Sequence, residues 1–269
     1  MSKHMNITEA IVTIKRFLTG KLLQSGLEGY VIGLSGGIDS ALSAALAVEA
    51  VGNGKLLAVL MPYRTSSERS VADAIELADK LGIEYRKIDI SPMIDAYYER
   101  IDDSNRLRAG NKMARERMSI LFDIAHETNR LVLGTGNRTE ICLGYTTWHG
   151  DSACSVNPLG ELYKSEVRLM ARELGVSESI LNKPPSADLW SGQTDEGEIG
   201  VTYEQIDDVL KLMLEDNVLS MAQLEKQGLQ ATDISRVVSM LNRNAFKRNL
   251  PAVAPLGRDG IPDNLNLKA

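Results

Sequence analysis

Apolar residues follow a helical repeat at the start of the chain and then gather into short runs. The positions that share the helical spacing are Ile7, Ile11, Ile14, Leu18 and Leu22. This pattern predicts an amphipathic helix that ends near Gly26. The next apolar run, 30–34, is short and continuous, and after a group of glycines the segment 41–47 is apolar on nearly all sides. We therefore expect a buried strand, a tight loop and a buried helix in this order.

Short apolar runs and helical patterns continue to alternate up to residue 133. The later strands are predicted at 56–61, 84–88 and 130–133, and the helices between them at 67–81, from 91 onward and at 111–128. Strands that alternate with helices predict a parallel sheet covered on both faces, with ligands bound beyond the carboxyl ends of the strands. The expected fold class is α/β, with a doubly wound, Rossmann-like sheet and a helical C-terminal part.

The second half of the chain is predicted to be mainly helical. One helix is expected at 163–174, and Thr202 with Gln205 forms a capping-box pattern that starts another. The stretch 183–198 between them contains prolines and glycines, which predicts a mobile loop. The tail, 251–269, is rich in Pro, Gly and Asn and is expected on the surface.

Composition and charge narrow the class of protein. With 43% hydrophobic and 25% charged residues the chain is typical of a globular protein, and its length favours a single domain, 1–269. The net charge of −6 argues against a surface that neutralises nucleic-acid phosphates, so a small substrate is favoured. Cys142 and Cys154 form no C-x-x-C pair, and no apolar run is long enough for a signal or membrane segment. We expect reduced thiols, a cytoplasmic location, and no nucleic-acid or membrane partner.

A glycine-rich segment joins the first predicted strand to its helix: Gly33-Leu34-Ser35-Gly36-Gly37-Ile38-Asp39-Ser40. Its glycines allow the backbone to approach a ligand closely, and its amides and hydroxyls, together with the start of a helix, can hold a phosphate. No lysine precedes the final serine, unlike in a Walker loop, so cleavage at the γ-phosphate is not the expected chemistry. A plain strand-to-helix turn is the alternative, but such a turn requires only one glycine and neither the serines nor the aspartate.

The segment 35–40 resembles the pyrophosphate-binding loop of the ATP pyrophosphatase superfamily, whose members adenylate a substrate and release pyrophosphate. Further motifs resemble the ammonia-dependent NAD synthetases, in the family's order and spacing over most of 29–210; they lie at 131–140, 144–145, 150–151, 157–159, 162–164, 183–189, 195–196 and Gly200. The resemblance implies a ligase that adenylates the carboxylate of deamido-NAD with ATP and then forms a C–N bond with ammonia. The implied products are NAD, AMP and pyrophosphate.

The same resemblance implies roles for individual residues. Contacts to ATP are implied for the loop 33–40, Thr135, Lys164 and Ser186, a contact to deamido-NAD for Arg115, Mg²⁺ ligation for Asp39 and Glu140, and catalytic roles for Asp39 and Lys164. The charges of these residues agree with the implied roles. Mg²⁺ prefers a few carboxylates together with phosphate oxygens. A lysine at a helix start is unfavourable unless an anion lies near it. Taken alone, Glu140 is also compatible with a solvated helix-start acid, and Lys164 and Arg115 with ordinary surface charges.

Three positions depart from the family pattern for holding deamido-NAD. Where many members have a lysine, an aspartate and a His-Lys pair, this chain has Trp148, Ser155 and Phe246-Lys247. Trp148 and Phe246 can stack on an aromatic ring of the substrate or simply pack within the protein. The hypothesis that these joint departures favour is a variant form of the same activity.

The resemblance also implies partners. A homodimer is expected, with the dinucleotide site at its interface, and free ammonia or ammonia from a separate protein is expected because no domain with a nucleophilic cysteine for glutamine hydrolysis is found. The stretch 183–198 is expected to order over the site when substrates bind, because the adenylate must be kept from water. Two alternatives stay open: another amide-forming or thiolating member of the superfamily, and a regulatory module that binds nucleotide without turnover.

Overall fold

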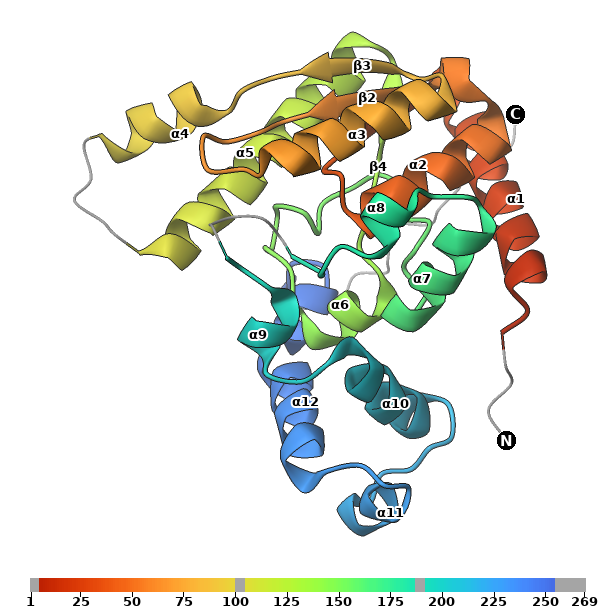
Figure 1. The fold of residues 1–269 in the computed structure, drawn as a ribbon, viewed down its shortest axis with the longest axis vertical. Helices are drawn as coiled ribbons and strands as arrows, with labels where there is room; N and C mark the ends of the chain where they lie inside the picture. The colour runs from red at the N-terminus through yellow and green to blue at the C-terminus, as the bar shows by residue number, and fades with distance from the viewer. Residues whose placement is uncertain (1–4, 100–104, 187–191, 255–269) are drawn as a thin grey trace.

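The computed structural model describes residues 5–99, 105–186 and 192–254, and its centre is a four-stranded parallel sheet (Figure 1). The strands are β1 (Gly29–Gly33), β2 (Leu56–Leu60), β3 (Glu84–Lys87) and β4 (Arg130–Leu133). They lie in the order β3-β2-β1-β4, so the chain builds outward from β1 on one side and then crosses over to place β4 on the other. The predicted parallel sheet is confirmed, and the order of its strands reverses between β1 and β4.

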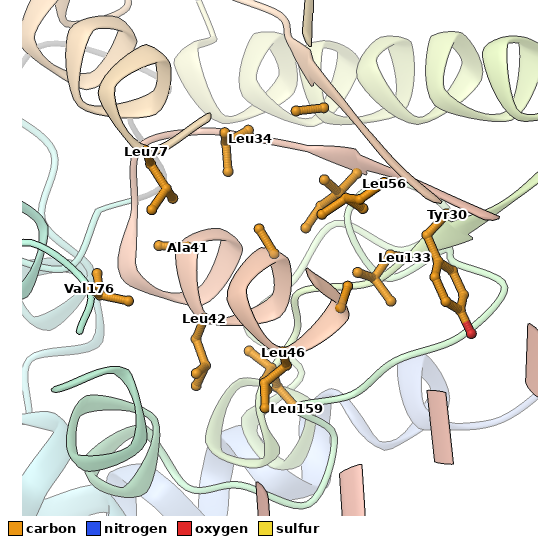
Figure 2. Close-up of a cluster of buried hydrophobic side chains, with 14 of the residues drawn as sticks. Tyr30, Leu34, Ala41, Leu42, Leu46, Leu56, Leu77, Leu133, Leu159 and Val176 are labelled. Carbon is orange, nitrogen blue, oxygen red and sulfur yellow. The ribbon is translucent and has the colours of Figure 1, made fainter. Parts of the chain in front are cut away.

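Helices cover both faces of the sheet, as predicted. One face carries α1 (Ile7–Ser25), α2 (Ile38–Val51), α3 (Glu68–Leu81) and α7 (Lys164–Glu173), and the other carries α4 (Ser91–Tyr98) and α5 (Arg106–Glu127). Figure 2 shows Leu42 and Leu46 of α2 in one cluster with Leu56 and Leu133 of the strands. The residues of α2 from Ser40 to Ala47 are all buried, which agrees with a segment that is apolar on nearly all sides.

The remaining helices build a second core beside the sheet. They are α6 (Arg138–Leu143), α10 (Tyr203–Leu214), α11 (Met221–Lys226) and α12 (Ala231–Arg243), and the short helices α8 (Glu178–Leu181) and α9 (Asp195–Ile199) lie in the segment that leads to them. Leu143, Ile206 and Val237 are fully buried in this core. In Figure 1, α6 lies between the sheet and the helices α10 and α12. The helical core therefore borders the edge at which β4 ends.

One predicted boundary is wrong: α5 begins at Arg106 and not at residue 111. The side chain of Asn105 caps this helix by accepting a hydrogen bond from the amide of Arg108 at 3.0 Å. A polar sequence therefore extends the helix by more than one turn, because the cap and not the apolar pattern determines where it begins.

Other predictions for the second half concern local structure. The capping box at Thr202 and Gln205 is confirmed, and residues 251–254 of the tail are exposed. Within the stretch 183–198, α9 is formed, whereas 187–191, like 255–269, lie outside the described residues. None of the helices in the described ranges combines the length and the apolar character that crossing a bilayer requires.

Candidate active site

A cavity of about 1540 Å³ opens at the edge where β1, β2 and β4 end. It lies where the strand order reverses, which is the usual position of ligand sites in open parallel sheets. Of the residues to which the resemblance gives a contact or a catalytic role, all but Arg115 line it: Gly33, Leu34, Ser35, Gly36, Gly37, Ile38, Asp39, Ser40, Thr135, Glu140, Lys164 and Ser186. Residues more than a hundred positions apart in the chain are thereby brought to one wall.

The loop between β1 and α2 is compact, and its polar groups face one another. The Ser40 hydroxyl accepts a hydrogen bond from the Ser35 amide at 3.3 Å and donates to the Gly37 carbonyl at 3.0 Å, and the Ser35 hydroxyl accepts from the Gly37 amide at 3.2 Å. Gly36 has a φ of 74° and lies against the Ser70 carbonyl of α3, so a Cβ at this position would overlap that oxygen. An anion that enters this loop meets backbone amides, two hydroxyls and the N-terminus of α2.

Next to this loop, one lysine joins two carboxylates from different elements. Lys164 Nζ lies 2.5 Å from Asp39 Oδ2 and 3.1 Å from Glu140 Oε1. Asp39 is in the first turn of α2, Glu140 is in the first turn of α6, and Lys164 is the first residue of α7. Asn137 orients both acids, because its amide donates to Asp39 Oδ1 at 2.9 Å and it forms a capping box with Glu140. The N-termini of three helices therefore meet at one ion cluster.

Burial determines the charges in this cluster. The Lys164 side chain is 2% exposed, and although desolvation acts to lower its pKa, the charges of Asp39 and Glu140 raise that pKa above its usual value. Desolvation raises the pKa of Glu140 to about 7, and the nearby Lys164 charge opposes this shift. Lys164 is thus a buried ammonium and not a surface lysine, and the two acids offset its unfavourable position at a helix N-terminus.

A buried acid from α10, Asp207, holds the start of α7. Its carboxylate accepts hydrogen bonds from the Thr139 hydroxyl at 2.5 Å and the Ser165 amide at 2.8 Å, and the Lys164 amide donates to Thr139 Oγ1 at 3.0 Å. Asp207 is 1% exposed, so these contacts are shielded from water. The sequence-based prediction missed Asp207; the available signal was an acid on the apolar side of the helix that starts after Thr202.

Two tyrosines bond to two acids beside the ion cluster, and Tyr145, Asp195 and Glu198 of this group line the cavity. The Tyr203 hydroxyl donates to Asp195 Oδ2 at 3.1 Å, and the Tyr145 hydroxyl donates to Asp195 Oδ1 at 3.3 Å and to Glu198 Oε2 at 2.6 Å. The Tyr203 ring lies 5.0 Å from Lys164 Nζ, and burial raises the pKa of Asp195. This wall is acidic where it adjoins the ion cluster.

Arg115 does not belong to the cavity wall. Its side chain is exposed, and its Nε donates to the Trp148 carbonyl at 3.1 Å. The Trp148 ring contacts the Phe246 ring edge-on, with centroids 5.2 Å apart, so the two aromatic residues pack on each other. The implied contact of Arg115 with deamido-NAD stays a prediction.

The third departure, Ser155, and Lys247, which keeps the lysine of the family's His-Lys pair, lie in different surroundings. The Ser155 hydroxyl accepts a hydrogen bond from the Val132 amide at 3.2 Å, which attaches it to β4. Lys247 lines the cavity, and its Nζ donates to the carbonyls of Gly144 at 2.8 Å and Thr146 at 2.7 Å. Burial lowers the pKa of Lys247.

Comparisons with known proteins agree with one another. A family model described as NAD synthase matches residues 10–251. The NH(3)-dependent NAD(+) synthetase of Chlorobium phaeobacteroides (strain DSM 266) is 44% identical over 90% of this chain and 87% of the relative. The NH(3)-dependent NAD(+) synthetase of Trichlorobacter lovleyi is 45% identical over 88% of this chain and 87% of the relative. The NMN synthetase of Francisella tularensis superposes with a TM-score of 0.82, 37% identity and coverage of 94% and 99%. The NH3-dependent NAD synthetase of Campylobacter jejuni, in complex with the nitrate ion, superposes with a TM-score of 0.79 and 34% identity. This match covers 93% of this chain and 99% of the neighbour.

Replacement of Asp207 by Asn tests whether this acid holds the ion cluster in place. We expect Asp207→Asn to lower the free energy of unfolding by ~2 kcal/mol, because a charged acceptor shielded from water is lost to the Thr139 hydroxyl and the Ser165 amide. Urea denaturation measures the change, with Asp208→Asn on the exposed side of α10 as the matched control. Equal stability of the two variants would contradict the role of Asp207.

Proposed function

The chain belongs to the NAD synthase family, and on this premise we propose that it is an ammonia-dependent NAD synthetase. The reaction joins ammonia to the nicotinate carboxylate of deamido-NAD, with ATP as the co-substrate, and it is a ligation that forms a C–N bond. The observation that carries the proposal is the placement of a phosphate-type loop, a buried lysine and two carboxylates in one cavity.

The geometry accounts for the first half of this reaction. A carboxylate oxygen of the substrate attacks the α-phosphorus of ATP, the bond to the α,β-bridging oxygen breaks, and pyrophosphate leaves with the negative charge. We propose that the Ser35 and Ser40 hydroxyls, which lie 3.0 Å apart, and the loop amides hold the departing group, with the positive charge of Lys164 beside them. Most of the rate enhancement then comes from positioning and from neutralising charge.

The second half requires only a nucleophile and a leaving group. Ammonia attacks the acyl carbon of the adenylate, the C–O bond to AMP breaks, and the nitrogen loses a proton as the amide forms. The acidic wall at Asp195 and Glu198 adjoins the ion cluster, and carboxylates at that place favour the approach of a small cation such as ammonium.

The residues present fit a magnesium ion. The carboxylates of Asp39 and Glu140 converge on the single positive charge of Lys164 Nζ, so both can face one cation. Among the described residues no group of three or more His, Cys, Asp or Glu side chains is gathered as a metal site, and Mg²⁺ characteristically combines one or two carboxylates with phosphate oxygens and water. We propose Asp39 and Glu140 as its protein ligands; the bound ion would balance charge on the leaving pyrophosphate.

A specific observation favours a second candidate substrate. The structural neighbour from Francisella tularensis is an NMN synthetase. This chain also differs from the family pattern at Trp148, Ser155 and Phe246, where many members contact the dinucleotide. The second candidate reaction is therefore amidation of nicotinate mononucleotide in the same cavity, by the same two steps.

A substrate comparison tests both candidates. With ATP and ammonium, we expect AMP and NAD to form in equal amounts from deamido-NAD, with a kcat/KM about 100-fold higher than for nicotinate mononucleotide, because contacts to the second nucleotide contribute to transition-state binding. Coupled assays of AMP and chromatography of the amide product measure this, with glutamine in place of ammonium as the control. The reverse preference would support the mononucleotide reaction, and nucleotide binding without AMP release would support a regulatory module.

Removal of either proposed metal ligand tests the magnesium assignment. We expect Asp39→Asn and Glu140→Gln each to lower kcat by about 100-fold, and to raise the Mg²⁺ concentration needed for half-maximal rate, because charge on the departing group is no longer balanced. The exposed Glu161→Gln serves as the control. NAD formation by Asp39→Asn at the unaltered rate would contradict the proposed site.

We further propose a homodimer, as implied by the family. Large apolar side chains are exposed on neighbouring helices of one sheet face: Met93 at 42% and Tyr97 at 45% on α4, and Leu107 at 63% and Phe122 at 43% on α5. Sedimentation velocity should give twice the chain mass of 29.5 kDa at assay concentrations. A species of the single-chain mass that is fully active would contradict the dimer.

A cytoplasmic location is proposed on the basis of thiol chemistry. Cys142 and Cys154 are free, and burial raises the pKa of both thiols. Cysteines that stay as free thiols fit a reducing compartment, because oxidising compartments favour disulfides.

A further inference from the structure

A lysine outside the ion cluster, Lys183, lines the cavity and contacts the phosphate-type loop through a backbone carbonyl. Its Nζ donates to the carbonyl of Gly36 at 2.9 Å and to Ser70 Oγ at 3.4 Å, and it lies 2.5 Å from Asp73 Oδ2. The Asp73 side chain is 7% exposed and the Lys183 side chain 22% exposed, so this ion pair is largely shielded from water. Neither residue belongs to the ATP contacts that the family resemblance implies.

The contact with Gly36 fixes the direction of one peptide group. In a trans peptide the carbonyl of one residue and the amide of the next point in opposite directions. With the Gly36 carbonyl bound to Lys183, the Gly37 amide points the other way, where it reaches the Ser35 hydroxyl at 3.2 Å. Ser35 and Gly37 both line the cavity, so an anion there can replace the Ser35 hydroxyl as the acceptor of this amide.

Glycines make this peptide group easy to turn over. Gly36 has a φ of 74°, and Gly37 follows it, so no side chain prevents rotation of the peptide between them. A reversed peptide would present the Gly36 carbonyl to the cavity, and a carbonyl oxygen repels the oxygens of a phosphate. A cation bound to that carbonyl in its present direction opposes the reversal.

We propose that Lys183, paired with Asp73, is a positioning residue for pyrophosphate binding, which it supports by holding the Gly36–Gly37 peptide with its amide toward the cavity. The inference rests on the proposed function in one respect: the loop holds the β- and γ-phosphates of ATP. Lys183 also precedes Pro184, Pro185 and Ser186, which line the cavity. The ion pair of Lys183 with Asp73 therefore also holds this segment in position next to the loop.

Binding measurements separate positioning from a direct contact. We expect Lys183→Met and Asp73→Asn each to weaken ATP binding about tenfold, the effect of one lost charge-assisted hydrogen bond, and the double variant to weaken it no further. Binding of AMP, which lacks the pyrophosphate part, should be unchanged. Isothermal titration calorimetry with Mg²⁺ measures all four proteins, and inhibition by pyrophosphate should weaken in parallel.

The matched control is Lys80→Met. Lys80 also donates to a backbone carbonyl, that of Gly175 at 2.6 Å, but it is exposed at the far end of α3 and does not line the cavity. Its replacement should leave ATP and AMP binding unchanged.

Three outcomes would overturn the inference. They are unchanged ATP binding in Lys183→Met, equal weakening of ATP and AMP, and a weakening in Lys183→Met that Asp73→Asn does not share, which would mean that Lys183 touches the phosphate directly. If Lys183→Met does not fold, the ratio of ATP to AMP binding in Asp73→Asn decides alone. A wild-type protein that binds ATP but forms no amide contradicts the proposed function and leaves the positioning test intact.

Discussion

The ion cluster of Lys164 with Asp39 and Glu140 constrains the structure around it. Moving a charge out of water costs several kcal/mol per ion, and the mutual attraction of the ions offsets this cost only when the geometry is good. Lys164 is 2% exposed, so its carboxylate partners must stay within ion-pair distance of its Nζ. Three helices must therefore begin at one place, and a change in any of them leaves a buried charge without its partner.

The parallel sheet makes this convergence possible. The strands β1 and β4 are neighbours that end at the same edge, so α2 and α6, which follow them, start close together. The third helix, α7, is attached through Asp207, which bonds to the Thr139 hydroxyl and the Ser165 amide. Because Asp207 belongs to α10, the helical core beside the sheet also helps to position Lys164, and the two cores act on one site.

The phosphate-type loop must also let its backbone come close to an anion. This depends on the shape of the backbone and not on a charged side chain. Gly36 lies against the Ser70 carbonyl where no side chain fits, and Lys183 binds the carbonyl of Gly36. Two cations thus act on the site in different ways. Lys164 is paired with two acids, whereas Lys183 acts on the loop through a backbone carbonyl.

The sequence by itself determined the elements and the chemistry that each one carries. Apolar periodicity predicted the strands and the buried helix α2, the pair Thr202 and Gln205 predicted the start of α10, and the glycines with serines predicted a phosphate-type loop, because these signals are local. The start of α5 was missed since one capping residue outweighs the apolar pattern there. Only the tertiary structure decided that Lys164 is buried against Asp39, 125 positions away, that Asp207 and Lys183 support the site, and that Arg115 lies outside the cavity wall. The physical reason is that burial and long-range ion pairs depend on how the elements pack. The sequence around a charged residue does not show which partner that residue contacts in the folded chain.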